Sequence, residues 1–161
     1  MGDLLLFTDG SVNAQSGVGF GACLLVEDPT LSLDTHRTQV RLKRFENTTS
    51  TRLELQVLLW ILGELKDVGV KLIIHTDSQN ILGLKKRRSR LEQNDFHSKA
   101  GKLLNNSDLY REFYDLIDQL DCRLVKVKGH KLSEDKDGTD LFFTLVDRAS
   151  REALRKDIEQ Q

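Results

Sequence analysis

One segment limits the possible folds more than any other, because residues 51–67 have the length of a helix and are apolar on almost every side. Its apolar residues are Leu53, Leu55, Val57, Leu58, Leu59, Trp60, Ile61, Leu62 and Leu65. A helix that is hydrophobic all round is usually buried on more than one side. Residues 47–50 (Asn-Thr-Thr-Ser) offer N-caps, and Gly69 follows the end of the segment. We therefore predict a helix packed between other layers.

Short apolar and β-branched segments on both sides of this helix predict a sheet. We expect strands at residues 4–7, 17–26, 33–45, 70–75 and 124–127, and further helices at residues 78–88, 107–120 and 141–156. The chain between the third and fourth strands is long enough for a parallel crossover. This order predicts an α/β fold with a mixed five-stranded sheet, a three-stranded antiparallel meander plus two parallel strands, and helices on both faces. We expect a single domain over residues 1–161.

Composition argues against several classes of protein. Lys and Arg number 24 and Asp and Glu 25, a net charge of −1 that is unlike a strongly basic protein that coats nucleic acid. No apolar run approaches the roughly 20 residues that span a bilayer, and the first residues lack the basic region of a signal peptide. Cys23 and Cys122 lie singly in apolar segments, so we expect buried, reduced thiols and a cytoplasmic location. We also expect a monomer with no membrane partner.

Two aspartates share one sequence setting. Asp9 follows an apolar segment in the run Phe-Thr-Asp-Gly-Ser, and Asp77 follows another in the run His-Thr-Asp-Ser-Gln. If these segments are parallel neighbours about 4.8 Å apart, both carboxylates end a strand at the same carboxyl edge of the sheet. Open α/β sheets bind ligands at that edge. The alternative is that Asp9 makes a turn and Asp77 caps the next helix.

Glu54 lies in the helix whose neighbours are almost all apolar. An unpaired buried carboxylate is costly, so Glu54 needs a cation, a partner or a shallow exposed stripe. The partner would be Arg52 or Lys66 at the helix surface. In the functional interpretation, Glu54 instead faces Asp9 across the sheet.

Carboxylates that converge on one point repel one another, and like charge and desolvation raise their pKa values. A bound Mg²⁺ or Mn²⁺ removes this repulsion, because hard cations prefer oxygen ligands. Two such ions about 3.5–4 Å apart can clamp an in-line phosphodiester displacement. The sequence contains no Cys or His cluster with zinc spacing. The acidic set therefore predicts metal-dependent phosphodiester chemistry.

Motifs spread over most of the chain resemble type 1 ribonuclease H. They are the Phe-Thr-Asp-Gly-Ser run at 7–11, the glycine-rich run at 17–22, and the runs at 48–55, 76–79, 127–130 and 146–149. The resemblance implies a ribonuclease H-like fold. It also implies an endonuclease that hydrolyses the RNA strand of RNA–DNA hybrids with two Mg²⁺ ions, for which Mn²⁺ can substitute.

The resemblance assigns catalytic roles to particular residues. Asp9, Glu54 and Asp77 would be the three core metal ligands, and Asp147 on the last helix would be the fourth. His130, in the loop after the fifth strand, would act in proton transfer or product release. The alternative to these roles is that Asp147 is a solvated helix residue and His130 an ordinary loop residue.

The resemblance also implies contacts with the substrate. Thr49, with nearby backbone groups, would hold a phosphate of the DNA strand, and Gln15 would contact the minor-groove side of the RNA strand. Such contacts read A-form shape and 2′-hydroxyls rather than base sequence. The candidates near the carboxylates are Gly10, Ser11, Gln15, Thr49, Ser50, Thr51 and Ser78.

A basic run at residues 85–90 is the other substrate-binding candidate. Lys85, Lys86, Arg87 and Arg88 would contact the phosphate backbone, so activity would fall with salt. The alternative is a solvated helix face. Many family members carry alternating Trp and Lys in this basic protrusion, whereas this chain has no Trp there.

The chain departs from the family pattern at a few other positions. Gln15, Ser50 and Thr51 stand where Asn is usual, and Phe143 stands four residues before Asp147, where a polar Asn is common. The loop between His130 and Asp147 is longer than usual. Two alternative functions remain open: a nuclease of this fold that acts on DNA junctions, duplexes or single strands, and a hybrid-binding module without turnover.

Overall fold

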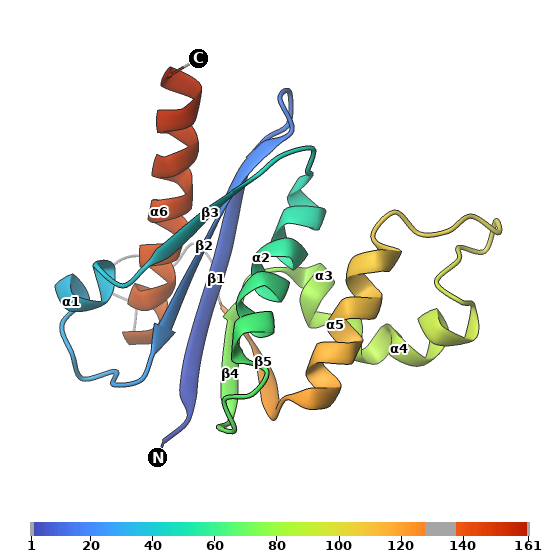
Figure 1. Cartoon of the computed structure of the whole chain (residues 1–161), viewed down its shortest axis with the longest axis horizontal. Helices are drawn as coiled ribbons and strands as arrows, with labels where there is room; N and C mark the ends of the chain where they lie inside the picture. Colours follow the sequence, from blue (N-terminus) through green and yellow to red (C-terminus); the bar gives the residue numbers. More distant parts are fainter. Residues whose placement is uncertain (1, 128–137, 161) are drawn as a thin grey trace.

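A five-stranded mixed sheet forms the centre of the molecule (Figure 1). The computed structural model describes residues 2–127 and 138–160. The strands lie in the order β3-β2-β1-β4-β5. The predicted sheet, an antiparallel meander extended by two parallel strands, is confirmed.

β1 joins the two halves of the sheet. β1 (Leu4–Asn13), β2 (Val18–Val26) and β3 (Arg41–Phe45) form the antiparallel meander. β4 (Leu72–Thr76) pairs in parallel with β1, and β5 (Cys122–Lys126) pairs in parallel with β4. Side chains near the carboxyl end of β1 therefore lie where the antiparallel and parallel halves meet.

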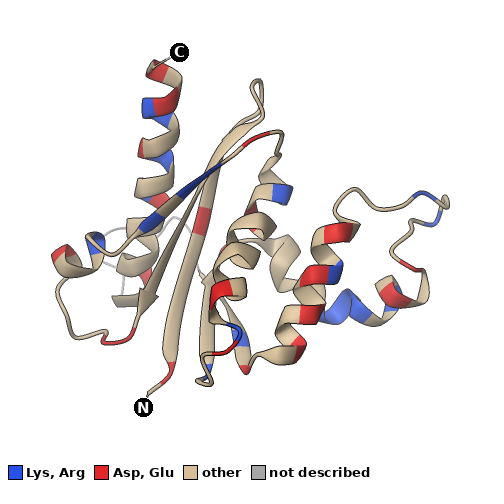
Figure 2. Ribbon diagram, viewed as in Figure 1, with Lys and Arg blue, Asp and Glu red and all other residues tan. Residues whose placement is uncertain are grey.

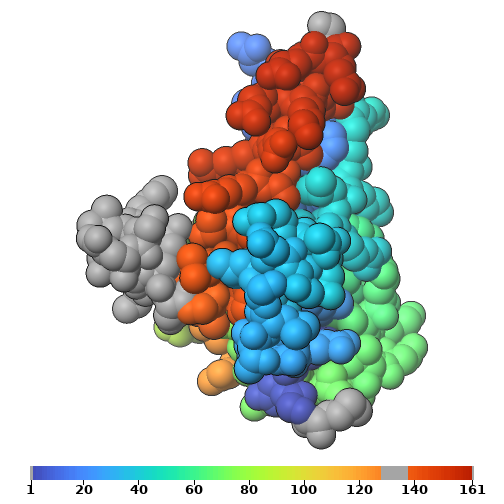
Figure 3. All heavy atoms as spheres, turned by 90° about the vertical axis from the view of Figure 1, so that its left-hand side faces the viewer, coloured from blue at the N-terminus to red at the C-terminus, as the bar shows by residue number. Residues whose placement is uncertain are grey.

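Helices cover both faces of the sheet. α2 (Ser50–Leu65), α3 (Gln79–Leu82), α4 (Leu84–Gln93) and α5 (Ser107–Gln119) lie on one side (Figure 1). α1 (Leu33–Arg37) and α6 (Gly138–Glu159) lie on the other side, and Figure 3 shows α1 beside α6 on that face. None of the described helices is both long and apolar enough to cross a membrane.

α2 is buried on two sides, as its sequence predicts. Leu55, Leu58 and Leu62 belong to one apolar cluster with sheet residues and with Leu109 and Phe113 of α5. Each fully buried side chain of this kind contributes about 1.5–3 kcal/mol of hydrophobic free energy. The helix thus forms the layer between the sheet and α5, and it brings its first turns towards β1 and β2.

Two glycines of β2 allow α2 to approach the sheet closely. A Cβ added to Gly19 would lie 2.7 Å from Leu53 Cδ2, and one added to Gly21 would overlap Val57. The alternating glycines of β2 therefore allow two side chains of α2, those of Leu53 and Val57, to lie close against the strand.

The segment predicted as one long edge strand, residues 33–45, is a short helix followed by a shorter strand. Ser32 begins α1, because its side chain accepts a hydrogen bond from the backbone N–H of Thr35. β3 starts only at Arg41. The strand prediction is wrong for residues 33–40, because the β-branched pattern outweighed this N-cap signal.

The predicted helix at residues 78–88 is two helices. Gly83 is the C-cap of α3 and the N-cap of α4, and α4 then continues to Gln93. The last helix is also longer than predicted, since it spans Gly138–Glu159. The helix predicted at residues 107–120 matches α5 closely.

Candidate active site

Asp9 and Asp77 lie at neighbouring positions on adjacent strands. β1 and β4 pair in parallel, with Phe7 opposite His75. Asp9 and Asp77 each come two residues later, so the same register leads to a pair of side chains on one face of the sheet. The predicted neighbourhood of these two aspartates therefore follows directly from the strand pairing.

The other roles considered for these aspartates are excluded. Asp9 lies inside β1, paired with Ala22 of β2, and therefore makes no turn. The N-cap of α3 is Ser78 rather than Asp77. The prediction that Asp9 ends its strand is also wrong, because the hairpin with β2 extends β1 as far as Asn13.

The Asp9 carboxyl is half-buried among other acids. Burial, the charge of Asp77 and a side-chain hydrogen bond with Asp147 raise the pKa of Asp9 to about 8. The backbone N–H of Gly10 acts in the opposite direction without cancelling these effects. A carboxylate in this setting is stabilised when a cation comes close.

Glu54 reaches the same region from α2. Burial raises the pKa of Glu54, a hydrogen bond from Ser78 opposes this, and the charge of Asp77 adds to it. Ser78 Oγ donates to Glu54 Oε2 at 2.6 Å. Arg52, one of the proposed partners of Glu54, instead binds Asp108 of α5 at 2.8 Å. Glu54 is therefore oriented by a hydroxyl of the β4–α3 connection and lies near the carboxylate of Asp77.

Asp147 joins the set from the opposite side of the sheet. It lies on α6, its side chain is 28% exposed, and Arg151 one turn later donates to its carboxylate at 2.9 Å. Its hydrogen bond with Asp9 shows that it is more than a solvated helix residue. Phe143, which stands where a polar residue is common in the family, is buried in the core under α6.

The carboxylates form linked pairs rather than one cage. Asp9 interacts with Asp77 and Asp147, and Asp77 interacts with Glu54. Within residues 2–127 and 138–160, no three His, Cys, Asp or Glu side chains lie close enough to hold one ion together. Mg²⁺ is usually bound through one or two carboxylates and keeps several waters. These pairs therefore fit a hard divalent cation in both donor type and number.

Comparison with known protein families agrees with the family that the sequence motifs resemble. The family model for RNase H matches residues 1–144. The chain belongs to the ribonuclease H family. Ribonuclease H of Caldicellulosiruptor saccharolyticus is 24% identical, over 97% of this chain and 99% of its own length. Ribonuclease H of Prochlorococcus marinus (strain NATL1A) is 33% identical, over 67% of this chain and 68% of its own length.

Solved structures share the fold of this ribonuclease H family member. The solution structure of the PFV RNase H domain has a TM-score of 0.68 and 16% identity, and covers 92% of this chain and 94% of that chain. The foamy viral protease-reverse transcriptase in complex with an RNA/DNA hybrid has a TM-score of 0.67 and 14% identity. The match covers 91% of this chain and 20% of that chain. The predicted family, fold and class of enzyme are confirmed.

The start of α2 lies beside the β1–β2 hairpin. Thr49 is the N-cap of α2 and accepts a hydrogen bond from the backbone N–H of Arg52. The backbone N–H of Thr48 donates to the carbonyl of Gly17 at 2.9 Å, which ties the helix start to the hairpin turn that carries the exposed Gln15. The predicted phosphate and RNA contacts therefore share one edge of the molecule.

Three of the four candidate cations of the basic helix α4 have hydrogen-bond partners within the protein. Arg87 donates to the backbone and side-chain oxygens of Asn80, and Arg88 forms two hydrogen bonds with Asp118 of α5. Lys85 and Lys86 are exposed, and Lys85 Nζ donates a long hydrogen bond of 3.4 Å to the backbone carbonyl of Cys122. Figure 2 shows basic α4 next to acidic residues of α5. The lysines are thus the more accessible cations of this helix.

Aromatic rings of α5 lie beneath these arginines, a feature that the sequence analysis did not predict. The guanidinium carbon of Arg88 is 4.9 Å from the ring centroid of Tyr114, and that of Arg87 is 5.9 Å from the ring of Tyr110. The chain thus combines cations and aromatics without the usual Trp, because the rings come from the next helix. Their helical spacing on residues 107–120 was the available signal.

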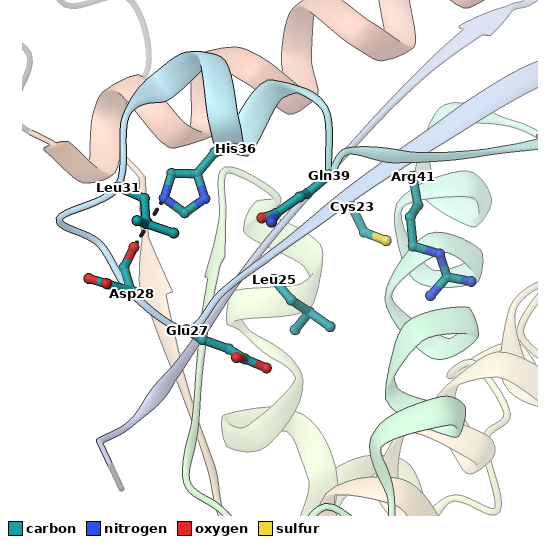
Figure 4. Close-up of a pocket in the computed structure, with 8 residues that line it drawn as sticks. All are labelled: Cys23, Leu25, Glu27, Asp28, Leu31, His36, Gln39 and Arg41. Carbon is teal, nitrogen blue, oxygen red and sulfur yellow. Dashed lines mark hydrogen bonds between the residues drawn. The ribbon is translucent and has the colours of Figure 1, made fainter.

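A cavity of about 300 Å³ lies beside β2 and the α1–β3 segment (Figure 4). It is lined by Cys23, Leu25, Glu27, Asp28, Leu31, His36, Gln39 and Arg41. None of the predicted site residues lines it. The candidate active site is therefore an edge of the sheet, separate from this hollow.

Ser150 is a second feature that the sequence analysis missed. Its side chain is fully buried on α6, three residues after Asp147, and its hydroxyl lies 3.1 Å from the hydroxyl of Ser11 on β1. The i, i+3 spacing from Asp147 was the available signal. His130, in contrast, lies outside the described residues, and its role stays a prediction.

Proposed function

We propose that this ribonuclease H family member is a divalent-metal-dependent endonuclease that hydrolyses the RNA strand of RNA–DNA hybrids. One observation carries the proposal: the half-buried Asp9 carboxyl lies against two other acids, and its pKa is raised to about 8. Such a group favours a cation, and a cation at this edge serves phosphodiester hydrolysis in a nuclease family.

Asp9, Glu54, Asp77 and Asp147 would hold the metal. We propose two Mg²⁺ ions in the substrate complex, with Mn²⁺ as a substitute. Ions held by these residues would supply Lewis-acid chemistry, which would lower the pKa of an attacking water and stabilise a leaving oxygen. The protein residues set the positions of the ligands: strand pairing keeps Asp9 beside Asp77, and the Ser78 hydroxyl orients Glu54. His130 would move a proton or assist product release.

The hybrid would lie across the edge formed by β1, the start of α2 and α4. The N-terminal end of α2, near Thr49, Ser50 and Thr51, presents backbone N–H groups and the positive end of the helix dipole, which suit a phosphate of the DNA strand. Gln15 and Gly10 would meet the RNA strand. One structural relative is in complex with an RNA/DNA hybrid and another with dsDNA, which supports nucleic acid as the partner.

Lys85 and Lys86 would supply most of the long-range attraction to phosphates, with a smaller share from Arg87 and Arg88, which have partners within the protein. We also propose that the protein acts as a monomer in the cytoplasm. Its two cysteines, Cys23 and Cys122, are free thiols, which suits a reducing compartment.

The test is a panel of labelled substrates with Mg²⁺ or Mn²⁺. The panel contains an RNA–DNA hybrid, duplex RNA, duplex DNA and both single strands. We expect cleavage of the RNA strand of the hybrid, and a loss of roughly 10³-fold or more in Asp9→Asn, because a metal ligand contributes several kcal/mol to the transition state.

The same panel separates the alternatives. Cleavage of duplex DNA alone would reject the hybrid as substrate, and hybrid binding without metal-dependent cleavage would indicate a binding module. Equal cleavage by the wild type and by Asp9→Asn would exclude Asp9 as a ligand. Circular dichroism of both proteins shows whether the variant is folded.

A further inference from the structure

β1 and α6 meet through three successive pairs of side chains. Alternate residues of β1 point to the same face of the sheet, and here that face packs on α6. The Phe7 and Phe142 rings pack edge-on with centroids 5.6 Å apart, and the Ser11 and Ser150 hydroxyls lie 3.1 Å apart. Between them in both elements are Asp9 and Asp147, joined by a side-chain hydrogen bond.

The serine pair has a defined direction. Ser150 Oγ donates to the backbone carbonyl of Asp147 at 3.1 Å. A hydroxyl carries only one proton, so the bond between the two serines must use the proton of Ser11. The result is a chain of two hydrogen bonds that runs from Ser11 on β1, through Ser150, to the backbone of Asp147 itself.

This chain opposes the repulsion within the middle pair. When Asp9 and Asp147 are both ionised, like charge pushes β1 and α6 apart at that point. The aromatic contact holds the two elements on one side of the acids, and the serine contact holds them on the other. Ser150 is fully buried, so water does not compete for its hydroxyl.

We propose that Ser11 and Ser150 are positioning residues that keep Asp147 close enough to Asp9 for the two carboxylates to bind a divalent cation together. The inference rests on the proposed function for the role of the cation, but it assigns the serines a task that is separate from catalysis. Ser11, considered above as a substrate contact, thereby gains a contact within the protein. The serines act through Asp147 rather than on the reacting atoms.

Metal binding without nucleic acid tests the proposal directly. Isothermal titration of the protein with Mn²⁺ gives the dissociation constant of the ion alone. We expect Ser150→Ala to weaken it about threefold to tenfold, the range that corresponds to one net hydrogen bond. In hybrid cleavage, the half-saturating metal concentration should rise by a similar factor, while kcat at saturating metal stays within about twofold.

A double-mutant cycle separates positioning from simple packing. Ser11→Ala should weaken Mn²⁺ binding on its own, and the double variant should bind no more weakly than Ser150→Ala, because the two hydroxyls share one interaction. Ser11→Thr keeps the donor and suits a strand, so it should bind Mn²⁺ like the wild type. Ser89→Ala on exposed α4 removes a hydroxyl elsewhere and serves as the control.

Each outcome decides the proposal. Unchanged Mn²⁺ affinity in Ser150→Ala, or additive losses in the cycle, would overturn it, as would a wild type that binds no Mn²⁺. If Ser150→Ala fails to fold, the Mn²⁺ affinities of Ser11→Ala and Ser11→Thr still decide the proposal. Equal affinities for these two variants would overturn it. A wild type that shows the coupling but cuts no hybrid would reject the proposed function and keep the serine role.

Discussion

The acidic residues at the sheet edge and the basic residues of α4 differ in how far neighbouring side chains compensate their charge. Arg88 forms hydrogen bonds of 2.6 Å with both Asp118 and Glu92, so its charge is compensated within the protein. Asp9 has acids as its close charged neighbours, and the pKa of its carboxyl is raised to about 8. The charge of Arg88 on α4 is thus compensated within the protein, whereas the carboxyl of Asp9 would be stabilised by an added cation.

Uncompensated charge is a stronger sign of function in this chain than compensated charge. Salt bridges at exposed positions contribute little to stability, about 0–1 kcal/mol each, so the α4–α5 pairs mainly orient side chains. A gathering of like charges is destabilising unless a ligand compensates it. The acids therefore mark the active site more strongly than the basic run, although the basic run is the more visible feature of the sequence.

Removing one acid should produce the largest effect. Asp77 interacts with both Asp9 and Glu54, so Asp77→Asn should lower the rate of hybrid cleavage by roughly 10³-fold or more at saturating metal. Gel-based cleavage rates measure this loss. Asp67→Asn, an exposed acid beyond the end of α2, is the matched control and should cut at the wild-type rate. Similar rates for the two variants would remove Asp77 from the site.

Without metal, the same acids should destabilise the fold. Asp9→Asn removes a carboxylate whose pKa is about 8 in the folded protein against an ordinary value of 3.8, a shift that corresponds to at most about 5–6 kcal/mol. Solvent screens this half-buried group, so we expect the variant to be more stable by about 2 kcal/mol at pH 8 in chelator. This corresponds to a Tm higher by about 4–8 °C in calorimetry.

The sign follows from the raised pKa. The folded wild type binds the Asp9 proton more tightly than the unfolded chain does, so its stability falls as pH rises from about 4 to about 8. The advantage of Asp9→Asn should therefore vanish near pH 4, and Mg²⁺ should reduce it at pH 8 by binding the wild type. A variant that is less stable than the wild type in chelator at pH 8 would contradict this account.

The basic helix should give a smaller, salt-dependent effect. The double substitution of Lys85 and Lys86 by Ala should raise KM for the hybrid about threefold to tenfold at low salt. It should also flatten the plot of log KM against the logarithm of the salt concentration. Arg88→Ala should change that slope less, because Asp118 and Glu92 already compensate its charge. Equal slopes for all three proteins would show that α4 is a solvated surface.

Releasing a compensated arginine should give the smallest effect, and in the opposite direction. Asp118→Asn removes one of the two carboxylates that hold Arg88 and leaves Glu92 in place, so the guanidinium becomes partly available to phosphate. We expect hybrid affinity to improve about twofold in fluorescence anisotropy at low salt, with a stability loss under about 1 kcal/mol. A weaker affinity would show that the ion pair itself presents α4 to the substrate.

Local patterns in the sequence predicted most of the fold. The all-round apolar segment predicted a helix between two layers, and α2 is that helix. The pattern failed at residues 33–45, where Ser32 caps α1, and at Gly83, where one predicted helix is divided in two. In both places a single capping residue decides the structure, and periodicity is insensitive to single residues.

The amino-acid pattern was enough to select the candidate acids, because Asp9 and Asp77 each follow an apolar segment and Glu54 lies within an apolar helix, where an unpaired charge is costly. How these acids meet depends on the packing of distant elements, which the local pattern does not contain. Ser11 and Ser150 are 139 residues apart in the chain, and Arg88 and Asp118 are 30 apart, yet both pairs are in contact. A periodic pattern reports which face of one element is buried, whereas the partner on that face depends on how distant elements pack.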